Sequence, residues 1–256
     1  MQRKITSDPL VRTSVLMAPS CVILGAGGHG RVVLDILMRC GSPRVVGFVD
    51  SNPALAGRRV DGVPVLGDID HLPDLRSRIG LDAAIVAVGD NGVRRAFADR
   101  VEAAGLQLIN AIHPSANLAR NITVGRNIVI AAGALVCAHC HLGDSVILNT
   151  GCIVDHESMI GPGAHICPGA RLAGRVVVES GAFVGIGATV IQNLRIGFNA
   201  IIGAGAVVIR DVAPCTTVVG VPARNITVAP EIEGRPKWTL PDLVHHVTPL
   251  ATSTGT

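Results

Sequence analysis

One aliphatic position recurs every six residues through the second half of the chain. From Leu118 to Val208, every sixth residue is Leu, Val or Ile without exception. A helix repeats its face about every 3.6 residues and a strand about every two, so neither keeps one face at multiples of six. A chain that turns a corner every six residues keeps one face at multiples of six. Hexapeptide spacing of this kind is typical of a parallel β-helix.

A longer period of eighteen residues is superimposed on the six. It relates Gly125, Gly143, Gly161 and Gly197, with Glu179 in the remaining place. Eighteen residues are three hexapeptides, so each coil is predicted to have three sides. Two residues before each aliphatic position the side chain is mostly small or aliphatic, as a second inward position of a short strand requires. The segment is therefore predicted to form a triangular prism of roughly five coils.

Before this ladder the pattern changes to short apolar strands that alternate with helices. Strands are expected at residues 21–24, 45–49 and 84–88, and a helix at residues 32–38. A second helix is expected to end near Gly105. Alternation of strands and helices is typical of an α/β domain with a parallel sheet.

The turn after the first strand has the sequence Gly-Ala-Gly-Gly-His-Gly at residues 25–30. Between a strand and a helix, G-x-G-x-x-G holds a diphosphate at the helix N-terminus. Asp50 ends the second strand, where an acid commonly binds ribose hydroxyls. A complete dinucleotide-binding domain needs about six strands, so a half-size domain for a nucleotide-linked ligand fits the length better. A purely structural glycine turn is the alternative.

Composition narrows the classes of function. Aromatic residues are 2% of the chain, which suits a narrow prism, and the net charge of +3 comes with no basic stripe of interleaved aromatics. Nucleic-acid binding is therefore not expected. No run reaches the roughly eighteen apolar residues of a membrane span, and residues 1–20 lack the apolar core of a signal peptide. We expect a cytoplasmic protein without membrane insertion.

One run of residues resembles a metal cluster. Cys137, His139, Cys140 and His141 lie within five positions. Alternation along a strand sends such side chains to opposite faces, and the hexapeptide spacing turns Cys140 inward. A structural zinc site needs four convergent ligands. No metal is therefore expected.

Polar residues gather at positions 149–157, and His156 is the candidate for chemistry among them. It lies two residues after an aliphatic ladder position, at a corner, and coils stacked at eighteen residues place Ala138 and Gly174 beside it. Small neighbours leave a slot for the imidazole. A carboxylate such as Glu157 makes a histidine more basic and suits it to general-base catalysis. An ordinary surface histidine is the alternative.

Four motifs occur together in this chain: the glycine turn at 25–30, Gly-Phe-Val-Asp at 47–50, Asn149-Thr150 with Asp-His-Glu at 155–157, and Val-Gly-Val-Pro-Ala at 219–223. With this combination the chain resembles the sugar O-/N-acyltransferase family of hexapeptide-repeat proteins. That family includes sialic acid O-acetyltransferases and N-acetyltransferases of UDP-linked 4-amino sugars. The resemblance covers about residues 20–224. It implies a left-handed parallel β-helix and a homotrimer that binds acetyl-CoA between neighbouring prisms.

The resemblance also implies roles for individual residues. His156 matches the general base of the family, and Glu157 matches the acid that raises its basicity. The positions that match contacts to the nucleotide sugar are Gly27, Gly28, His29, Asp50, Ser51, Gly89 and Asn149. The positions that match the coenzyme groove are His165, Ile186, Gly203, Ala204 and Arg224.

The expected protein is thus an α/β Rossmann-like half domain followed by an all-β left-handed β-helix. We expect a flexible segment at 1–19, a nucleotide-sugar-binding domain at 20–112, an acyltransferase domain at 113–224 and an arm or tail at 225–256. The expected activity is N-acetylation of a UDP- or GDP-4-amino sugar with acetyl-CoA, for surface-glycan biosynthesis. One alternative is O-acetylation of sialic acid or a related sugar. The other is a dinucleotide-binding sensor whose β-helix only forms the trimer.

Overall fold

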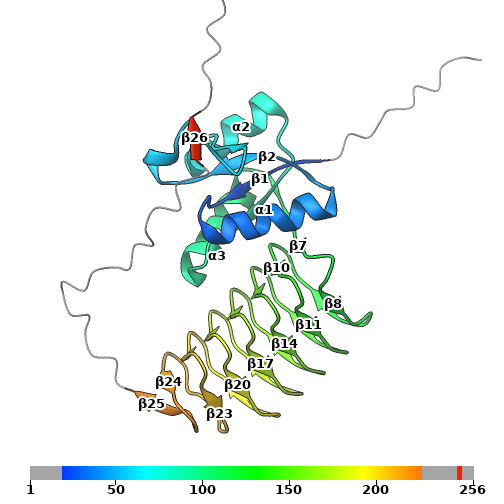
Figure 1. The fold of residues 1–256 in the computed structure, drawn as a ribbon, viewed down its shortest axis with the longest axis vertical. Helices are drawn as coiled ribbons and strands as arrows, with labels where there is room; N and C mark the ends of the chain where they lie inside the picture. Colours follow the sequence, from blue (N-terminus) through cyan, green and yellow to red (C-terminus); the bar gives the residue numbers. More distant parts are fainter. Residues whose placement is uncertain (1–18, 227–246, 250–256) are drawn as a thin grey trace, which may run out of the picture.

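A computed structural model describes residues 19–226 and 247–249. The flexible segment expected at 1–19 and most of the expected tail therefore lie outside the described residues. An α/β domain sits on one side of a prism of stacked coils (Figure 1). No helix in the described ranges is long and apolar enough to cross a membrane.

The α/β domain is built on a four-stranded parallel sheet of order β2-β1-β5-β6. Its elements are β1 (Ser20–Leu24), α1 (Gly28–Cys40), β2 (Arg44–Val49), η1 (Pro53–Leu55), β3 (Arg58–Val60), β4 (Val63–Pro64), η2 (Ile69–His71), α2 (Leu72–Ile79), β5 (Ala83–Val86), α3 (Asn91–Ala103) and β6 (Gln107–Leu108). A small antiparallel sheet joins β3 and β4 to β26 (Val247–Pro249).

Strand β1 is apolar along its whole length because both of its faces are covered. Cys21 and Ile23 pack with α1 in one core, whereas Val22 and Leu24 pack with α2 and α3 in another. Helices on both faces are typical of a parallel sheet. Chain order reverses at β1, since β2 lies on one side of it and β5 on the other, which makes the carboxyl ends of these strands the usual ligand site of such a sheet.

The second part of the chain forms a prism with three parallel sheets, which we call faces 1, 2 and 3. Face 1 contains β7 (Ala111–Ile112), β10 (Val129–Ile130), β13 (Ile147–Leu148), β16 (His165–Ile166), β19 (Phe183–Val184), β22 (Ile201–Ile202) and β24 (Thr217–Val219), with β25 (Arg224–Ile226) antiparallel at its end. Face 2 contains β8 (Asn117–Leu118), β11 (Leu135–Val136), β14 (Ile153–Val154), β17 (Arg171–Leu172), β20 (Thr189–Val190) and β23 (Val207–Val208). Face 3 contains β9 (Thr123–Val124), β12 (His141–Leu142), β15 (Met159–Ile160), β18 (Val177–Val178) and β21 (Arg195–Ile196).

Coils stack in register at eighteen residues, as Ile147, His165 and Phe183 show on face 1. The six strands of face 2 give six coils, one more than the sequence suggested. The aliphatic ladder and the small residues two places before it fill the interior, where Cys140 and Cys152 are at most 1% exposed. Alternation within each short strand thus produces a narrow apolar core.

The corners of the prism have a regular backbone conformation. Every sixth residue from Asn127 to Gly205 has a positive φ, and each lies three residues after a ladder residue. Glycine occupies half of these positions, but Glu157 (φ 59°) and Arg175 (φ 59°) occupy two others. A left-handed backbone costs a residue with a β-carbon roughly 1–2 kcal/mol. Charged residues are therefore kept at two corners where glycine would be less strained.

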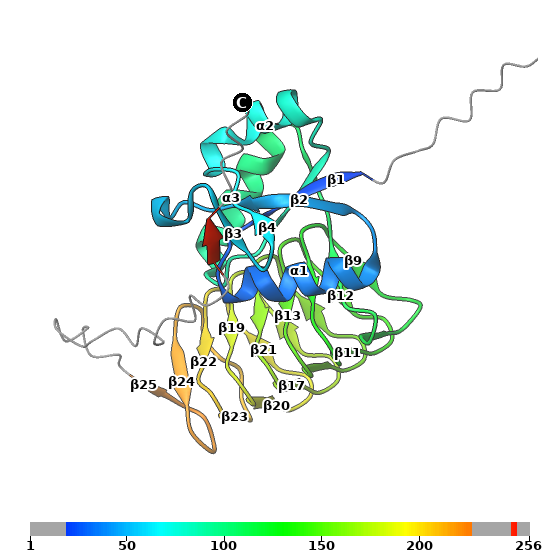
Figure 2. The same ribbon diagram turned by 45° about the horizontal axis from the view of Figure 1, so that its top comes forward.

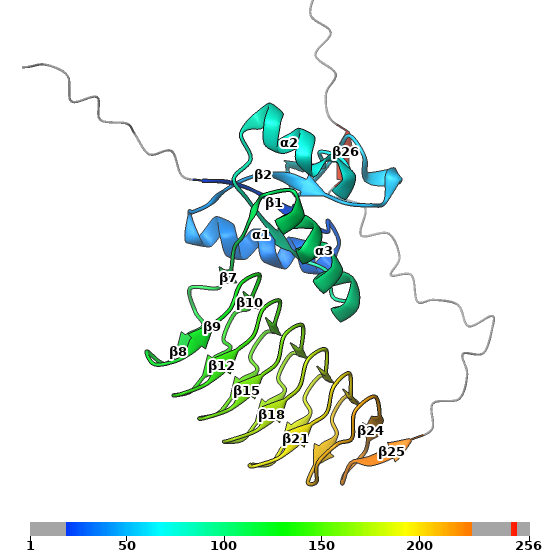
Figure 3. The ribbon, with the colours of Figure 1, turned by 180° about the vertical axis from the view of Figure 1, so that it is seen from behind.

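The α/β domain packs on face 1 of the prism. The outward side chains of Ala111, Val129 and Ile147 belong to the same core as α1. Figures 2 and 3 show α1 between the sheet and the coils, and Figure 3 shows one end of α3 extending toward the coils. Polar bonds add to this contact, among them Asn91 Nδ2 to the carbonyl of Gly181 at 2.8 Å.

Candidate functional site

The glycine turn forms one wall of a pocket at the carboxyl ends of β1, β2 and β5. Gly25, Asp50, Ser51 and Val88 line it together with apolar side chains of the same domain. A β-carbon on Gly30 would collide with the carbonyl of Gly25, so the close approach of α1 to the turn requires glycine there. Gly28, in contrast, faces open space. The turn is thus closed on its inner side and open outward.

Asp50 holds this turn in place. Its Oδ2 accepts a hydrogen bond from the backbone N–H of Ala26 at 2.7 Å, and its Oδ1 accepts one from Asn52 at 2.8 Å. Gly27, the N-cap of α1, gives the helix no side-chain cap. The first N–H groups of α1 therefore have no side-chain partner from the N-cap and can donate to an anionic group. Asp50 therefore stabilises the shape of the turn. Its carboxylate oxygens have further lone pairs that can accept hydrogen bonds from hydroxyl groups of a ligand.

Two histidines lie where the α/β domain rests on face 1. His29, at the start of α1, and His165, on β16, each have one buried ring nitrogen without a hydrogen-bond partner among the described residues, Nε2 and Nδ1 respectively. The other nitrogen of His165 lies 3.2 Å from Asn149 Nδ2, and its ring meets Phe183 edge-on at 5.2 Å. Burial and the nearby charge of Arg94 lower the pKa of each histidine to about 4.

His165 thus lies beside the nucleotide-side residues His29 and Asn149. The coenzyme positions Ile186 and Ala204 lie instead at the corner between faces 1 and 2, on successive coils joined by the Gly205 N–H to Ile186 carbonyl bond. Ile186 is 61% exposed there. Gly203 precedes this corner, and Arg224 lines a separate hollow at the end of the prism with Arg210 and Asp211.

His156 lies at the corner between faces 2 and 3. Its Nδ1 is 3.7 Å from Glu157 Oε2, and that oxygen is 3.5 Å from Arg175 Nη1. A β-carbon on Gly174 would lie 2.5 Å from Cε1 and Nε2 of the imidazole, so Gly174 provides the slot expected from the eighteen-residue stacking. The side chains of His156 and Glu157 are about half exposed. An accessible imidazole nitrogen and an adjacent carboxylate can act as a general base.

Asn149 and His156 belong to one coil but not to one corner. Asn149 follows face 1, whereas His156 follows face 2. In a triangular prism, the corner between faces 2 and 3 is opposite face 1, where the α/β domain sits. Within one chain, the candidate base and the nucleotide pocket therefore lie on different sides of the prism.

The cysteines near these residues are poor nucleophiles. Cys152 is fully buried, and burial raises the pKa of its thiol to about 12. Cys140 points inward, with Sγ 3.1 Å from the carbonyl of Asp155. Within residues 19–226 and 247–249, no three His, Cys, Asp or Glu side chains come together as metal ligands would.

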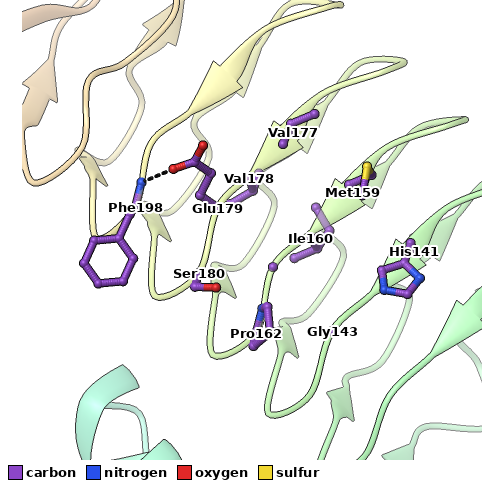
Figure 4. Close-up of a pocket in the computed structure, with 11 residues that line it drawn as sticks. His141, Gly143, Met159, Ile160, Pro162, Val177, Val178, Glu179, Ser180 and Phe198 are labelled. Atoms are coloured by element: carbon purple, nitrogen blue, oxygen red, sulfur yellow. Dashed lines mark hydrogen bonds between the residues drawn. The ribbon is translucent and has the colours of Figure 1, made fainter.

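A hollow on the described surface lies on face 3, and none of the predicted site residues lines it. It has a volume of about 410 Å³ and is bordered by His141, Met159, Val177 and Phe198 (Figure 4). Glu179 Oε2 accepts the backbone N–H of Phe198 at 2.7 Å at one end. Met159 and Phe198 are about half exposed, so this face presents apolar side chains to the outside.

Sequence reasoning missed Arg94. This arginine of α3 is completely buried, and its guanidinium reaches carbonyls of both domains. An arginine next to Arg95 on an amphipathic helix looks like an exposed residue, because the pattern along one helix does not show what packs against it. Only the docking of the prism buries it.

Comparison with known proteins bears directly on these sites. A family model for the PglD N-terminal domain matches residues 20–101. UDP-N-acetylbacillosamine N-acetyltransferase of Bacillus subtilis (strain 168) is 35% identical over 112 residues, which are 43% of this chain and 50% of that protein. The matched part therefore spans about half the length of this curated relative.

Solved structures match along most of the chain. PerB from Caulobacter crescentus, solved in complex with CoA and GDP-perosamine, is 41% identical to this chain. The match covers 81% of this chain and 97% of the PerB chain, with a TM-score of 0.77. The acetyltransferase domain of PglB from Neisseria gonorrhoeae FA1090, in complex with acetyl coenzyme A, is 33% identical, covers 82% and 100%, and has a TM-score of 0.76. These likenesses confirm the expected fold class, a Rossmann-like half domain followed by a left-handed parallel β-helix. The chain belongs to the sugar O-/N-acyltransferase family of hexapeptide-repeat proteins.

Proposed function

We propose that this protein transfers an acetyl group from acetyl-CoA to the amino group of a nucleotide-linked amino sugar. The observation that carries the proposal is the 41% identity to PerB, a protein solved with CoA and GDP-perosamine. This match covers 81% of the present chain and 97% of the PerB chain. The glycine turn held by Asp50 supports a nucleotide-linked acceptor. The slot at Gly174 beside His156 supports a base-catalysed transfer.

The proposed reaction is a direct transfer. The amine nitrogen attacks the thioester carbonyl, and Nε2 of His156 takes the proton that the nitrogen loses. Glu157 faces Nδ1 across 3.7 Å, and its negative charge stabilises the imidazolium that forms. The tetrahedral intermediate then collapses, the carbon–sulfur bond breaks, and the imidazolium protonates the departing thiolate. The products are the N-acetylated sugar nucleotide and free CoA, with no acyl-enzyme.

The two substrates are assigned to different surfaces. The nucleotide occupies the pocket at Gly27, Gly28, Asp50, Ser51 and Gly89. The amino sugar extends from it toward His29, Asn149 and His165. The coenzyme follows the corner column of Ile186, Gly203 and Ala204, with Arg224 available to a phosphate group. His165 borders both regions, because β16 leads into that corner from beneath the α/β domain.

A homotrimer completes this site. His156 lies at the corner opposite the face that carries the α/β domain, so a neighbouring copy must bring a base to each nucleotide pocket. The exposed apolar side chains of face 3, such as Met159 and Phe198, support contact between copies. The cytoplasmic location stays a prediction.

The activity is tested with acetyl-CoA and a panel of UDP- and GDP-linked 4-amino sugars, while release of the CoA thiol is followed. We expect turnover with at least one of them. Turnover only with free sialic acid would favour the O-acetyltransferase alternative. Calorimetric binding of NAD, with no binding of any sugar nucleotide and no turnover, would favour the sensor.

His156→Ala tests the base. We expect turnover to fall by roughly a hundred- to ten-thousand-fold, the usual contribution of a general base, with the fold intact because His156 lies outside the core. His139→Ala is the matched control, since His139 lies at the same corner one coil earlier. Near-normal turnover of the His156 variant, with loss in the His139 or His165 variant, would overturn the assignment.

A further inference from the structure

Arg94 is a fully buried cation whose hydrogen-bonding capacity is used up inside the protein. Nε donates to the carbonyl of Ser145 at 2.8 Å, and Nη1 donates to the carbonyls of Val88 and Gly89 at 3.0 and 3.1 Å. Nη2 donates to Asn91 Oδ1 and to the carbonyl of Gly163, both at 2.8 Å. A guanidinium has five N–H donors, so this one has none left for a substrate phosphate.

These bonds join two parts of the proposed site. Val88 and Gly89 follow β5, and Val88 lines the nucleotide pocket, whereas Ser145 and Gly163 lie at the same corner of the prism on successive coils. One side chain therefore fixes the pocket loop to two coils. Its acceptors are four carbonyls and an amide oxygen, so no carboxylate bonds to the charge directly; Asp90, the N-cap of α3, is the carboxylate that acts on it at longer range.

We propose that Arg94 is a positioning residue: it fixes the Val88–Gly89 loop, at the border of the nucleotide pocket, to two coils of the prism. The consequence for binding of the nucleotide sugar rests on the proposed function. The fixing of the loop does not depend on it.

The proposal is tested with two variants of Arg94. Arg94→Gln removes the charge and most of the N–H donors, and Arg94→Lys keeps the charge without the fork of bonds. Both should bind the nucleotide sugar more weakly than the wild type.

Arg95→Gln is the matched control, because Arg95 is the exposed neighbour on the same helix. It should bind the nucleotide sugar as the wild type does. A loss of affinity there equal to that of Arg94→Gln would show a general effect of charge on this helix and overturn the proposal.

The kinetic measurement uses Arg94→Lys, which also serves if Arg94→Gln does not fold. Lysine cannot reproduce the fork of bonds to both domains. We expect KM for the nucleotide sugar to rise roughly tenfold, with kcat and KM for acetyl-CoA little changed. If the protein lacks acetyltransferase activity, the affinity for the nucleotide by calorimetry replaces KM. Wild-type nucleotide binding in this variant would overturn the positioning role.

Discussion

The imidazole of His156 lies directly against Gly174, eighteen residues further along the chain and one coil higher in the prism. Gly174 has no positive φ, so its backbone would tolerate a side chain. Its need for glycine comes from the ring beside it. The position of the candidate base is thus set by the absence of a single methyl group on the next coil.

Gly174→Ala should therefore displace His156 without unfolding the prism. A β-carbon 2.5 Å from the ring forces the imidazole to move, and a misplacement of about 1 Å can cost a hundredfold in rate. We expect kcat to fall by at least tenfold, with the melting temperature changed by only a few degrees. Gln192→Ala, at the same corner one coil further, is the control. Full activity of Gly174→Ala would contradict the role of the slot.

Glu157→Gly should separate stability from activity. Glu157 has a φ of 59°, a conformation in which glycine avoids a cost of roughly 1–2 kcal/mol, partly offset by the greater freedom of glycine in the unfolded chain. We expect a melting temperature at or above that of the wild type and a loss of turnover smaller than that of His156→Ala. Glu157→Ala should show the same loss of turnover without the gain in stability. A Gly variant less stable than the Ala variant would contradict the strain.

Mixed trimers should test whether one site uses two copies. His156→Ala lacks the base, and Gly28→Leu adds a side chain to the open side of the glycine turn. Each should be nearly inactive alone. If base and pocket come from different copies, random mixing should recover about a quarter of wild-type turnover, and light scattering should give about three times 26.4 kDa. No recovery in confirmed mixed trimers would place the whole site within one chain.

Stability should fall in mildly acidic solution because of His29 and His165. Their pKa in the folded protein is about 4, against 6.5 for an unperturbed histidine. Between these values the unfolded chain binds more protons, so stability falls as pH decreases from 6.5 and is regained as pH rises. Each ring contributes roughly 1.4 kcal/mol per pH unit. Urea unfolding between pH 6.5 and 5 should show this slope, and His165→Asn should reduce it by about half; a flat wild-type profile would contradict the burial.

The sequence was most informative where structure repeats. The ladder from Leu118 to Val208 predicted the prism, its inward side chains and the stacking of Gly174 on His156, because every coil obeys one register. The left-handed corners could not be read in the same way, because half of them are not glycine. In the α/β domain, β5 ends at Val86, two residues before the expected end, because Val88 belongs to the loop that Arg94 binds.

Contacts between the two parts of the chain could not be predicted. The environment of His29 and His165 and the burial of Arg94 depend on how the α/β domain docks on face 1. The hydrophobic periodicity of the sequence carries no information about that docking. The expected domain boundaries and the roles of individual site residues stay predictions, whereas the family and the fold class are confirmed.

The eighteen-residue register means that the length of the prism increases in equal steps of one coil. Each coil advances the chain by about 4.8 Å, the spacing of neighbouring strands. The length of the groove along the corner at Ile186 and Ala204 is therefore set by the number of coils. Insertion or loss of eighteen residues would lengthen or shorten that groove by one coil, and every later strand would stay on the same face. An insertion of six would turn each later side chain onto the next face, so chain length in this protein can vary freely only in units of one full turn.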